Sequence, residues 1–323
     1  MEQQLNAPSN LREAIAYFAD PDLALAFLVE MRWPDGVVCP HCEAREPLFL
    51  KTRRIWKCRE CRKQFSVKVG TVFEDSPLGL DKWLPALWLL ANAKNGISSY
   101  EIARSLGVTQ KTAWFMLGRI RLAMQTMTFE RFDGEVEVDE SFIGGKAKNM
   151  HKKKLNRPPM KGTSVKGKTA VMGLLQRGPD GQSQIRASVV HSVKKHELDA
   201  KVRANVVPGA TINTDALPSY NQLYTEYDHH TVDHQYEWVR VLPDGRKVHT
   251  NGLENFWSVL KRGLKGTYIS VDPFHLFRYV AEQSFRFNLR SLTDAERFKR
   301  VAQQIVGKRL TYTALTGAKL ATT

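Results

Sequence analysis

The sequence predicts an α/β protein in which a mixed sheet with flanking helices follows a small cysteine-rich module and a pair of short helices. All four cysteines lie between residues 39 and 61, and the pattern changes from helical to strand-rich after about Phe132. The second part then reads as three strands, a helix, a strand and further helices, which suits a sheet whose ligands gather at its strand ends. We therefore expect domains at 1–75, 76–131 and 132–290, and a C-terminal tail at 291–323.

The composition favours a polyanionic partner. The chain has 323 residues, of which 48 are Lys or Arg and 33 are Asp or Glu, for a formal net charge of +15. Such an excess strengthens binding to nucleic acid through counterion release, although ribosomal and membrane-surface proteins share it. No apolar run approaches the roughly 20 residues that span a bilayer. The N-terminus lacks a secretory signal, so we expect a cytoplasmic protein in a reducing compartment with no membrane partner.

The cysteines form two C-x2-C pairs separated by fifteen residues: Cys39, Cys42, Cys58 and Cys61. Two residues between cysteines let both thiolates of a knuckle face one ion, and two knuckles complete a tetrahedron. Two disulfides or a redox dithiol are the alternatives. The missing secretion signal argues against disulfides, and a redox motif needs only one pair. We therefore predict one structural Zn²⁺, which also stabilises a ribbon too small to fold alone.

The predicted ribbon is strongly basic. Seven cationic residues lie in or beside its second half: Lys51, Arg53, Arg54, Lys57, Arg59, Arg62 and Lys63. Contact with nucleic acid is the preferred interpretation. The alternative is a protein-docking ribbon with a solvated basic face.

A helix-turn-helix is predicted from Ile97 to Met124. Ser98 or Ser99 can cap a first helix that Gly107 ends, and Thr109 can cap a second. Two short helices joined by a turn with glycine are typical of this DNA-binding motif, whose second helix enters the major groove. An ordinary helical hairpin in a core is the alternative. On the DNA-binding interpretation, the second helix starts at Thr109, Gln110, Lys111 and Thr112.

The strand-rich part has a readable order of elements. We expect strands, a helix and a basic, mobile loop. The strands are 136–143, 169–176, 184–193 and 210–214, the helix is 195–204, and the loop is 146–168.

Three acidic residues occupy distinct contexts in this part. Asp139 and Asp215 follow short β-branched runs, and Glu254 lies in the first turn of an amphipathic helix. Carboxylates at strand ends and a helix start can converge on one point, where they repel each other unless a cation lies between them. Mg²⁺ prefers a few carboxylate oxygens and completes its shell with water and phosphate. The pattern therefore predicts metal-dependent chemistry on a nucleic-acid backbone.

At this point the sequence resembles a known family. VDESFIGGK, NTDALPSY and HTNGLENFWSVLKRGLKGTY, behind the CPHC and CREC pairs, are similar to DDE transposases of bacterial insertion sequences. The resemblance is to the group with a zinc ribbon and a helix-turn-helix ahead of an RNase H-like domain, and it extends from about Leu23 to about Asn288. It implies metal-ligand roles for Asp139, Asp215 and Glu254. It implies a DNA-holding role for Lys261, which is seven residues after Glu254 and on the same helical face.

The resemblance also implies a mechanism. Two Mg²⁺ ions, with Mn²⁺ as an alternative, would lie about 4 Å apart and support hydrolysis at the ends of an element. The exposed 3′-OH would then attack target DNA. Double-stranded DNA would be the partner, and bringing two ends together requires a dimer or larger assembly. The rival interpretations are an RNase H-like nuclease without strand transfer and a DNA-binding regulator with an inactive catalytic domain.

The third acidic position has open alternatives. Asn251 and Glu254 form N-x-x-E ahead of an apolar helix, which is the signature of a capping box. Some members of the resembling family use Asn as the third residue, so Asn251 competes with Glu254. Glu137 shares the predicted face of Asp139 and is either a secondary ligand or a solvated or salt-bridged neighbour, whereas Glu140 should point to the opposite side.

Overall fold

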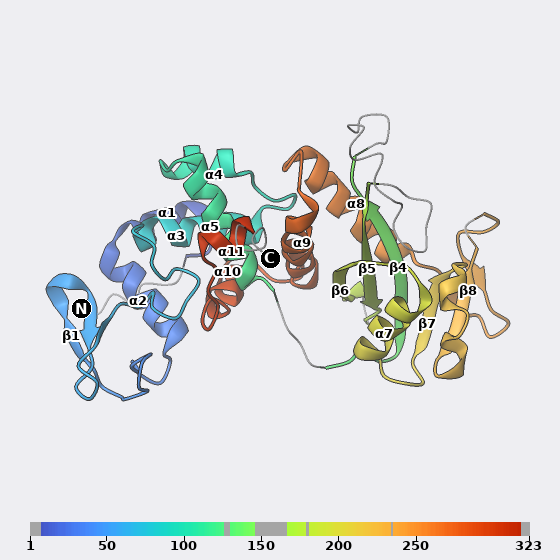
Figure 1. Cartoon of the computed structure of the whole chain (residues 1–323), viewed down its shortest axis with the longest axis horizontal. Coiled ribbons are helices and arrows are strands. Elements are labelled where there is room, and N and C mark those ends of the chain that lie inside the picture. Colours follow the sequence, from blue (N-terminus) through green and yellow to red (C-terminus); the bar gives the residue numbers. More distant parts are fainter. Residues whose placement is uncertain (1–7, 126–129, 146–166, 179–180, 234, 318–323) are drawn as a thin grey trace. The chain divides into compact units, whose positions relative to one another are not determined.

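The computed structural model describes residues 8–125, 130–145, 167–178, 181–233 and 235–317. The chain forms two compact units. The first comprises Met1–Thr126 and Leu292–Thr323 and is called the helical unit here. The second, Met127–Ser291, is called the sheet unit (Figure 1). The expected loop at 146–168 lies outside the described residues except for its last two positions.

The helical unit contains seven helices and a small three-stranded sheet among its described residues. The helices are α1 (Leu11–Ala19), α2 (Pro21–Arg32), α3 (Leu80–Asn92), α4 (Ser99–Leu106), α5 (Gln110–Ala123), α10 (Asp294–Gln303) and α11 (Tyr312–Thr316). The strands are β1 (Leu48–Leu50), β2 (Ile55–Lys57) and β3 (Gln64–Phe65), joined in antiparallel order β1-β2-β3.

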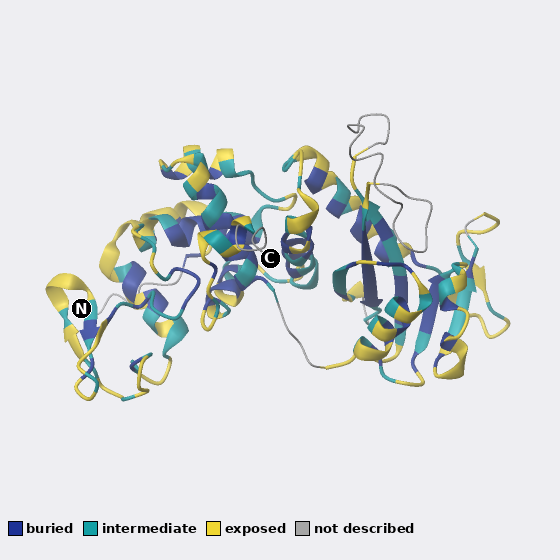
Figure 2. Ribbon diagram, in the orientation of Figure 1, coloured by how far each residue is buried: buried dark blue, intermediate teal, exposed yellow. Residues whose placement is uncertain are grey.

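The end of the chain packs into the core of the helical unit. The Phe298 ring of α10 lies 5.2 Å from Phe27 and 5.0 Å from Trp88, measured between ring centroids. Phe298 is buried. Most residues of α3 are buried as well, and the ribbon of Figure 2 is coloured by this burial. The segment expected to be a C-terminal tail therefore contributes helices to this core. The predicted domain limits themselves remain predictions.

The sheet unit is built on a five-stranded mixed sheet with the order β6-β5-β4-β7-β8. Its strands are β4 (Glu135–Ile143), β5 (Thr169–Gln176), β6 (Gln184–Val190), β7 (Thr211–Asp215) and β8 (Asp228–Val232). β4 pairs antiparallel with β5 and parallel with β7. β6 is three residues shorter than expected, because the His191 amide donates to Glu197 as the chain turns into the next helix. A two-stranded ribbon, β9 (Arg240–Val241) and β10 (Lys247–Val248), follows β8.

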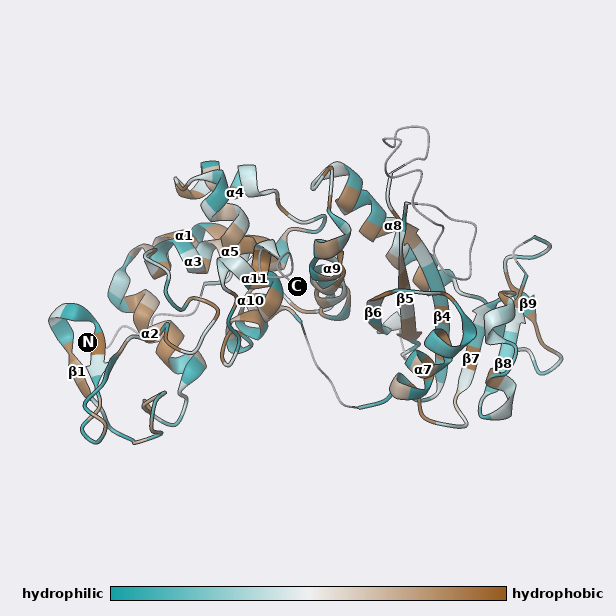
Figure 3. Cartoon of the chain, viewed as in Figure 1, coloured by the Kyte–Doolittle hydropathy of each residue, from teal (hydrophilic) through white to brown (hydrophobic). Residues whose placement is uncertain are grey.

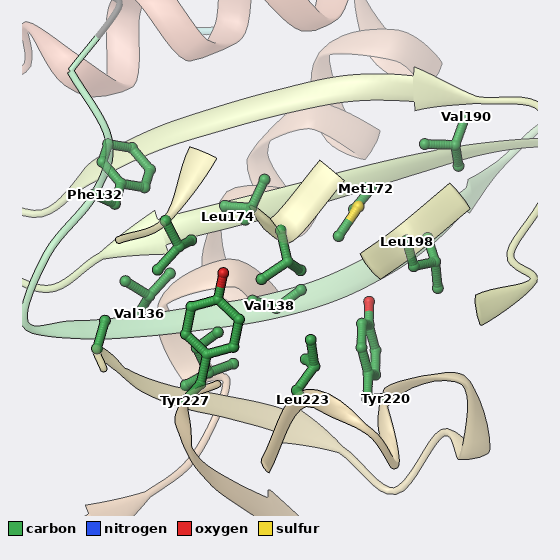
Figure 4. Close-up of a cluster of buried hydrophobic side chains, with 14 of the residues drawn as sticks. Phe132, Val136, Val138, Met172, Leu174, Val190, Leu198, Tyr220, Leu223 and Tyr227 are labelled. Atoms are coloured by element: carbon green, nitrogen blue, oxygen red, sulfur yellow. The ribbon is translucent and has the colours of Figure 1, made fainter. Parts of the chain in front are cut away.

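Helices cover both faces of this sheet. α7 (Lys195–Asn205) packs on one face, in a core that includes Val136 and Val138 of β4 (Figure 4). α8 (Asn251–Gly266) and α9 (Leu276–Asn288) pack on the other face. β5 is apolar on both sides and contributes side chains to both cores, which explains its continuous hydrophobic run (Figure 3). The predicted mixed sheet with flanking helices is confirmed. Among the described helices, none is both long and apolar enough to cross a membrane.

Candidate functional site

Strand β4 carries a row of acidic side chains on the face that α8 covers. Glu135, Glu137 and Asp139 alternate with valines that belong to the α7 core, so the acids point the other way. Two hydrogen bonds confirm the direction. The Leu253 amide donates to Glu137 at 3.0 Å, and the Trp257 indole donates to Asp139 at 2.9 Å.

Asp139 and Asp215 lie at the same level of neighbouring parallel strands. The paired register of β4 and β7 ends with Val138 opposite Thr214, so one further step brings Asp139 beside Asp215. Adjacent strands are only about 4.8 Å apart. Burial and then repulsion from Asp215 raise the pKa of Asp139 to about 6. The two predicted acids therefore approach each other, as expected. Asp215 ends β7 as predicted, whereas Asp139 lies in the middle of β4, which continues to Ile143.

One face of helix α8 carries Glu254, Trp257 and Lys261 and packs over Asp139. Glu254, Trp257 and Lys261 recur at three- and four-residue spacing and share one face of the helix. Trp257 donates to Asp139, and Glu254 adds to the repulsion that raises the pKa of Asp139. Burial lowers the pKa of Lys261, and the Asp139 carboxylate opposes that shift. Glu254 and Lys261 thus flank the residue that contacts Asp139 directly.

Two donors fix the orientation of the Asp139 carboxylate. Its Oδ1 accepts from the Glu140 amide at 2.8 Å, and its Oδ2 accepts from the Trp257 indole. Each oxygen keeps a further lone pair that a cation can use. A carboxylate that is held in this way is oriented before any ligand arrives.

Gly173 makes the approach of Trp257 possible. It is the cross-strand partner of Asp139 on β5. A Cβ at this glycine would lie 2.8 Å from the Trp257 ring and 2.7 Å from Leu253. Our sequence interpretation missed both Gly173 and Trp257. The available signal was a glycine inside a strand-like run, which often marks a close approach.

The capping-box interpretation of the third acidic position is wrong. α8 begins at Asn251 itself, its N-cap is Thr250, and no side chain of that cap bonds the first turn. Asn251 is exposed, whereas Glu254 is half-buried. Glu254 is therefore the fourth residue of the helix, one place beyond the capping-box position, and the choice between the two residues as third ligand remains a prediction.

Two further acids of β4, Glu137 and Glu140, lie beside Asp139 in the sequence. Glu137 is 1% exposed and pairs with Arg177 at 2.8 Å, so it is the salt-bridged neighbour of the two alternatives. Glu140 lies near the pair, because Asp139 and Asp215 add to the burial that raises its pKa well above the ordinary value. Its Oε1 is buried and has no hydrogen-bond partner within the described part of the chain.

The four cysteines form a compact cluster in the helical unit. The sulfur atoms of Cys39 and Cys61 lie 3.7 Å apart, and those of Cys42 and Cys58 lie 3.5 Å apart. None of these four cysteines is in a disulfide. Zinc–sulfur bonds of about 2.3 Å in a tetrahedron require sulfur separations of about 3.8 Å. The cluster therefore fits one zinc ion, and the spacing is too long for the two disulfides considered above.

The cysteine cluster and the carboxylates differ in how closely their ligand atoms meet. Within the described ranges, the cysteines are the one group of three or more His, Cys, Asp or Glu residues close enough to hold an ion together, with ligand atoms within 4.8 Å. The carboxylates converge less tightly.

The predicted helix pair is present in the helical unit. Ser98 and Glu101 form a reciprocal capping box on α4, and Gly107 ends that helix with φ 63°. Thr109 caps α5 by accepting from the Thr112 amide. Lys111, in the first turn of α5, is exposed. The described residues thus form the two capped helices that the sequence predicts.

Two family descriptions match the chain. Residues 131–288 match the ISXO2-like transposase domain, and residues 20–64 match the transposase zinc-ribbon domain. A protein from Halobacterium salinarum, described as an uncharacterized protein in transposable element ISH50, is 26% identical over 258 residues. That alignment spans 77% of this chain and 85% of the relative.

A mixed sheet with acids on two neighbouring strands, together with a zinc ribbon and the two matched domains, defines a transposase-type protein. The chain belongs to the transposases of insertion sequences that carry an ISXO2-like domain behind a zinc ribbon. The resemblance inferred from the sequence motifs is confirmed.

Proposed function

We propose that the chain cuts and joins DNA at the ends of an insertion sequence, with Asp139, Asp215 and Glu254 holding catalytic Mg²⁺. One observation carries the proposal: Asp139 lies in register beside Asp215, and the α8 face with Glu254 and Lys261 packs over it. Carboxylate oxygens with room for water and phosphate are the donor set that Mg²⁺ prefers.

The chain's own residues prepare the reaction. Trp257 and the Glu140 amide orient Asp139, so little rearrangement is needed when substrate binds. Lys261 supplies a cation beside the carboxylates for a DNA phosphate, a contact that positions the strand without reading its sequence. Bound Mg²⁺ would activate an attacking oxygen and stabilise the leaving 3′ oxygen. Water as the nucleophile gives hydrolysis, and the released 3′-OH in its place gives joining to target DNA.

DNA recognition is proposed for the helical unit. The basic ribbon and the exposed first turn of α5 are the candidate contacts, with Lys111 exposed there. The partner is double-stranded DNA of element ends and target, and joining two ends requires at least two copies of the chain. The cationic segment 146–168 lies almost wholly outside the described residues.

The test is cleavage and 3′-end joining of DNA that carries the ends of the parent element, with Mg²⁺ added or omitted. Asp139→Asn, Asp215→Asn and Glu254→Gln should each lose activity by more than the about hundredfold that changes around metal ligands cost. Asn251→Ala should retain activity. Loss with Asn251→Ala and retention with Glu254→Gln would exchange their roles. Cleavage without joined product would favour the nuclease, and binding without cleavage would favour the regulator.

A further inference from the structure

Arg177, directly after β5, forms hydrogen bonds both to β4 and to the segment that precedes α8. Its Nε donates to Glu137 Oε1 at 2.8 Å, and its Nη1 pairs with Glu135. Its Nη2 donates to the His249 carbonyl at 2.8 Å and contacts the imidazole Nδ1 at 2.7 Å. The Lys247 carbonyl accepts from Nη1 at 3.2 Å. One guanidinium thereby links two acids of β4 to the segment immediately before α8.

Glu137 extends this link into the helix. Its second oxygen, Oε2, accepts from the Leu253 amide in the first turn of α8. First-turn amides have no partner within their own helix, and a negative charge there is also favoured by the helix dipole. The Thr250 side chain makes no capping bond. The Glu137 carboxylate, from strand β4, therefore accepts the hydrogen bond that an N-cap side chain would otherwise accept.

Gly252 allows the carboxylate to reach the helix. A Cβ at this position would lie 2.9 Å from Glu137 Oε2 and 3.1 Å from Oε1. The carboxylate cannot move aside freely, because Arg177 and the Leu253 amide hold one oxygen each. Any side chain at this position would disturb the contact between strand and helix.

Two contacts define the position of α8 on β4. Glu137 accepts from the Leu253 amide in the first turn, and Asp139 accepts from the Trp257 indole about one turn later. Both acids lie on the same face of β4, so two separate points of α8 are held against that face. Two points of attachment restrict both the rotation of the helix and its translation along its axis. Glu254 lies between the two helical contacts.

We propose that Glu137, held by Arg177, is a positioning residue that sets α8 on the sheet so that Glu254 faces Asp139. The proposal rests on the proposed function, since it assigns Glu254 to the metal site. Glu137 is not itself a ligand in this scheme, because its charge is paired with Arg177 and it is only 1% exposed. Its contribution to metal binding is made through the helix.

Gly252→Ala is the sharpest variant, because it changes no charge and replaces glycine by a better helix former. Gly266→Ala is the matched control: it lies at the other end of α8, and a Cβ there meets nothing within 4 Å. The readout is the dissociation constant for Mn²⁺, from electron paramagnetic resonance of the free ion with the full chain. Gly252→Ala should weaken Mn²⁺ binding about tenfold, with the sheet unit still folded at the temperature of the measurement. Gly266→Ala should bind as the wild type does.

Arg177→Lys supplies a second variant that keeps the charge and loses the planar fork. Its control is Arg290→Lys, an exposed residue of the same unit whose guanidinium bonds to the carbonyls of Gly181 and Ser183. Arg177→Lys should weaken Mn²⁺ binding while DNA affinity in a gel-shift assay stays unchanged. Wild-type affinity in both Gly252→Ala and Arg177→Lys would overturn the inference. A wild-type chain that neither binds Mn²⁺ nor cleaves DNA would instead overturn the proposed function.

Discussion

The cysteine cluster and the carboxylate site are assembled in opposite ways. The cysteines come from two short knuckles within one stretch of the chain, and their sulfur atoms lie within 4.8 Å of one another. The carboxylates come from β4, β7 and α8, which only the fold of the sheet unit brings together. The first site is a local motif on a small ribbon, whereas the second rests on two hydrophobic cores. Zinc should therefore be required for folding at the cysteine cluster, whereas Mg²⁺ should bind to a carboxylate site that is already folded.

Zinc removal should give the largest difference between the two sites. Structural zinc contributes about 10–16 kcal/mol to the folding of isolated zinc-finger peptides, and the ribbon strands are only two or three residues long. Cys58→Ser should therefore unfold the ribbon, while β4, β5 and β7 keep their protection. Hydrogen exchange followed by mass spectrometry, peptide by peptide, measures this directly.

The same experiment without added Mg²⁺ provides the contrast. The sheet unit should keep its exchange protection in Mg²⁺-free buffer, because its cores do not include the metal. Equal loss of exchange protection in both units after Cys58→Ser would contradict the inference that zinc stabilises only the ribbon. Loss of protection in β4 on withdrawal of Mg²⁺ would show that the carboxylate site also depends on its ion for folding.

The same contrast explains what could be predicted from the sequence. C-x2-C spacing and β-branched runs are local, so the ribbon, the helix pair and the strands were predictable. The approach of Asp139 to Asp215 was expected from strand ends, but it arises because β4 and β7 pair in parallel with Asp139 in the middle of β4. The contacts of Trp257 and Arg177 are long-range, and no spacing encodes them. Gly173 could have been noticed, yet its partner Trp257 was knowable only once α8 was placed on the sheet.

Gly173→Ala tests how tightly the carboxylate site depends on packing. The added methyl would overlap Leu253 and Trp257, and overpacking of this kind costs about 1–3 kcal/mol. Gly145→Ala, at the end of β4, is the control, because a Cβ there meets nothing within 4 Å. The free energy of opening of β4 and β5 from hydrogen exchange should fall for Gly173→Ala alone. If the two variants had equal opening free energies, α8 could move away from the sheet without loss of stability.

The smallest expected effect concerns the charge of Asp139 in the metal-free protein. Its pKa is raised from 3.8 to about 6, first by burial and then by Asp215. Between these pH values the folded state binds a proton that the unfolded state has lost. The contribution of Asp139 to stability should therefore fall as pH rises from about 4 to about 6, by an amount on the order of 1 kcal/mol after solvent screening.

Asp139→Asn removes this titration, so the comparison is made on slopes. The substitution also changes a hydrogen bond to Trp257 or to the Glu140 amide, but that offset does not vary with pH. In Mg²⁺-free buffer, the opening free energy of β4 in Asp139→Asn minus that of the wild type should increase between pH 4 and pH 7. Added Mg²⁺ should then stabilise only the wild type, because the cation replaces the proton between the acids. Parallel pH profiles would mean that Asp139 is not under electrostatic strain, and that the carboxylate site lacks the repulsion which makes it a place for a cation.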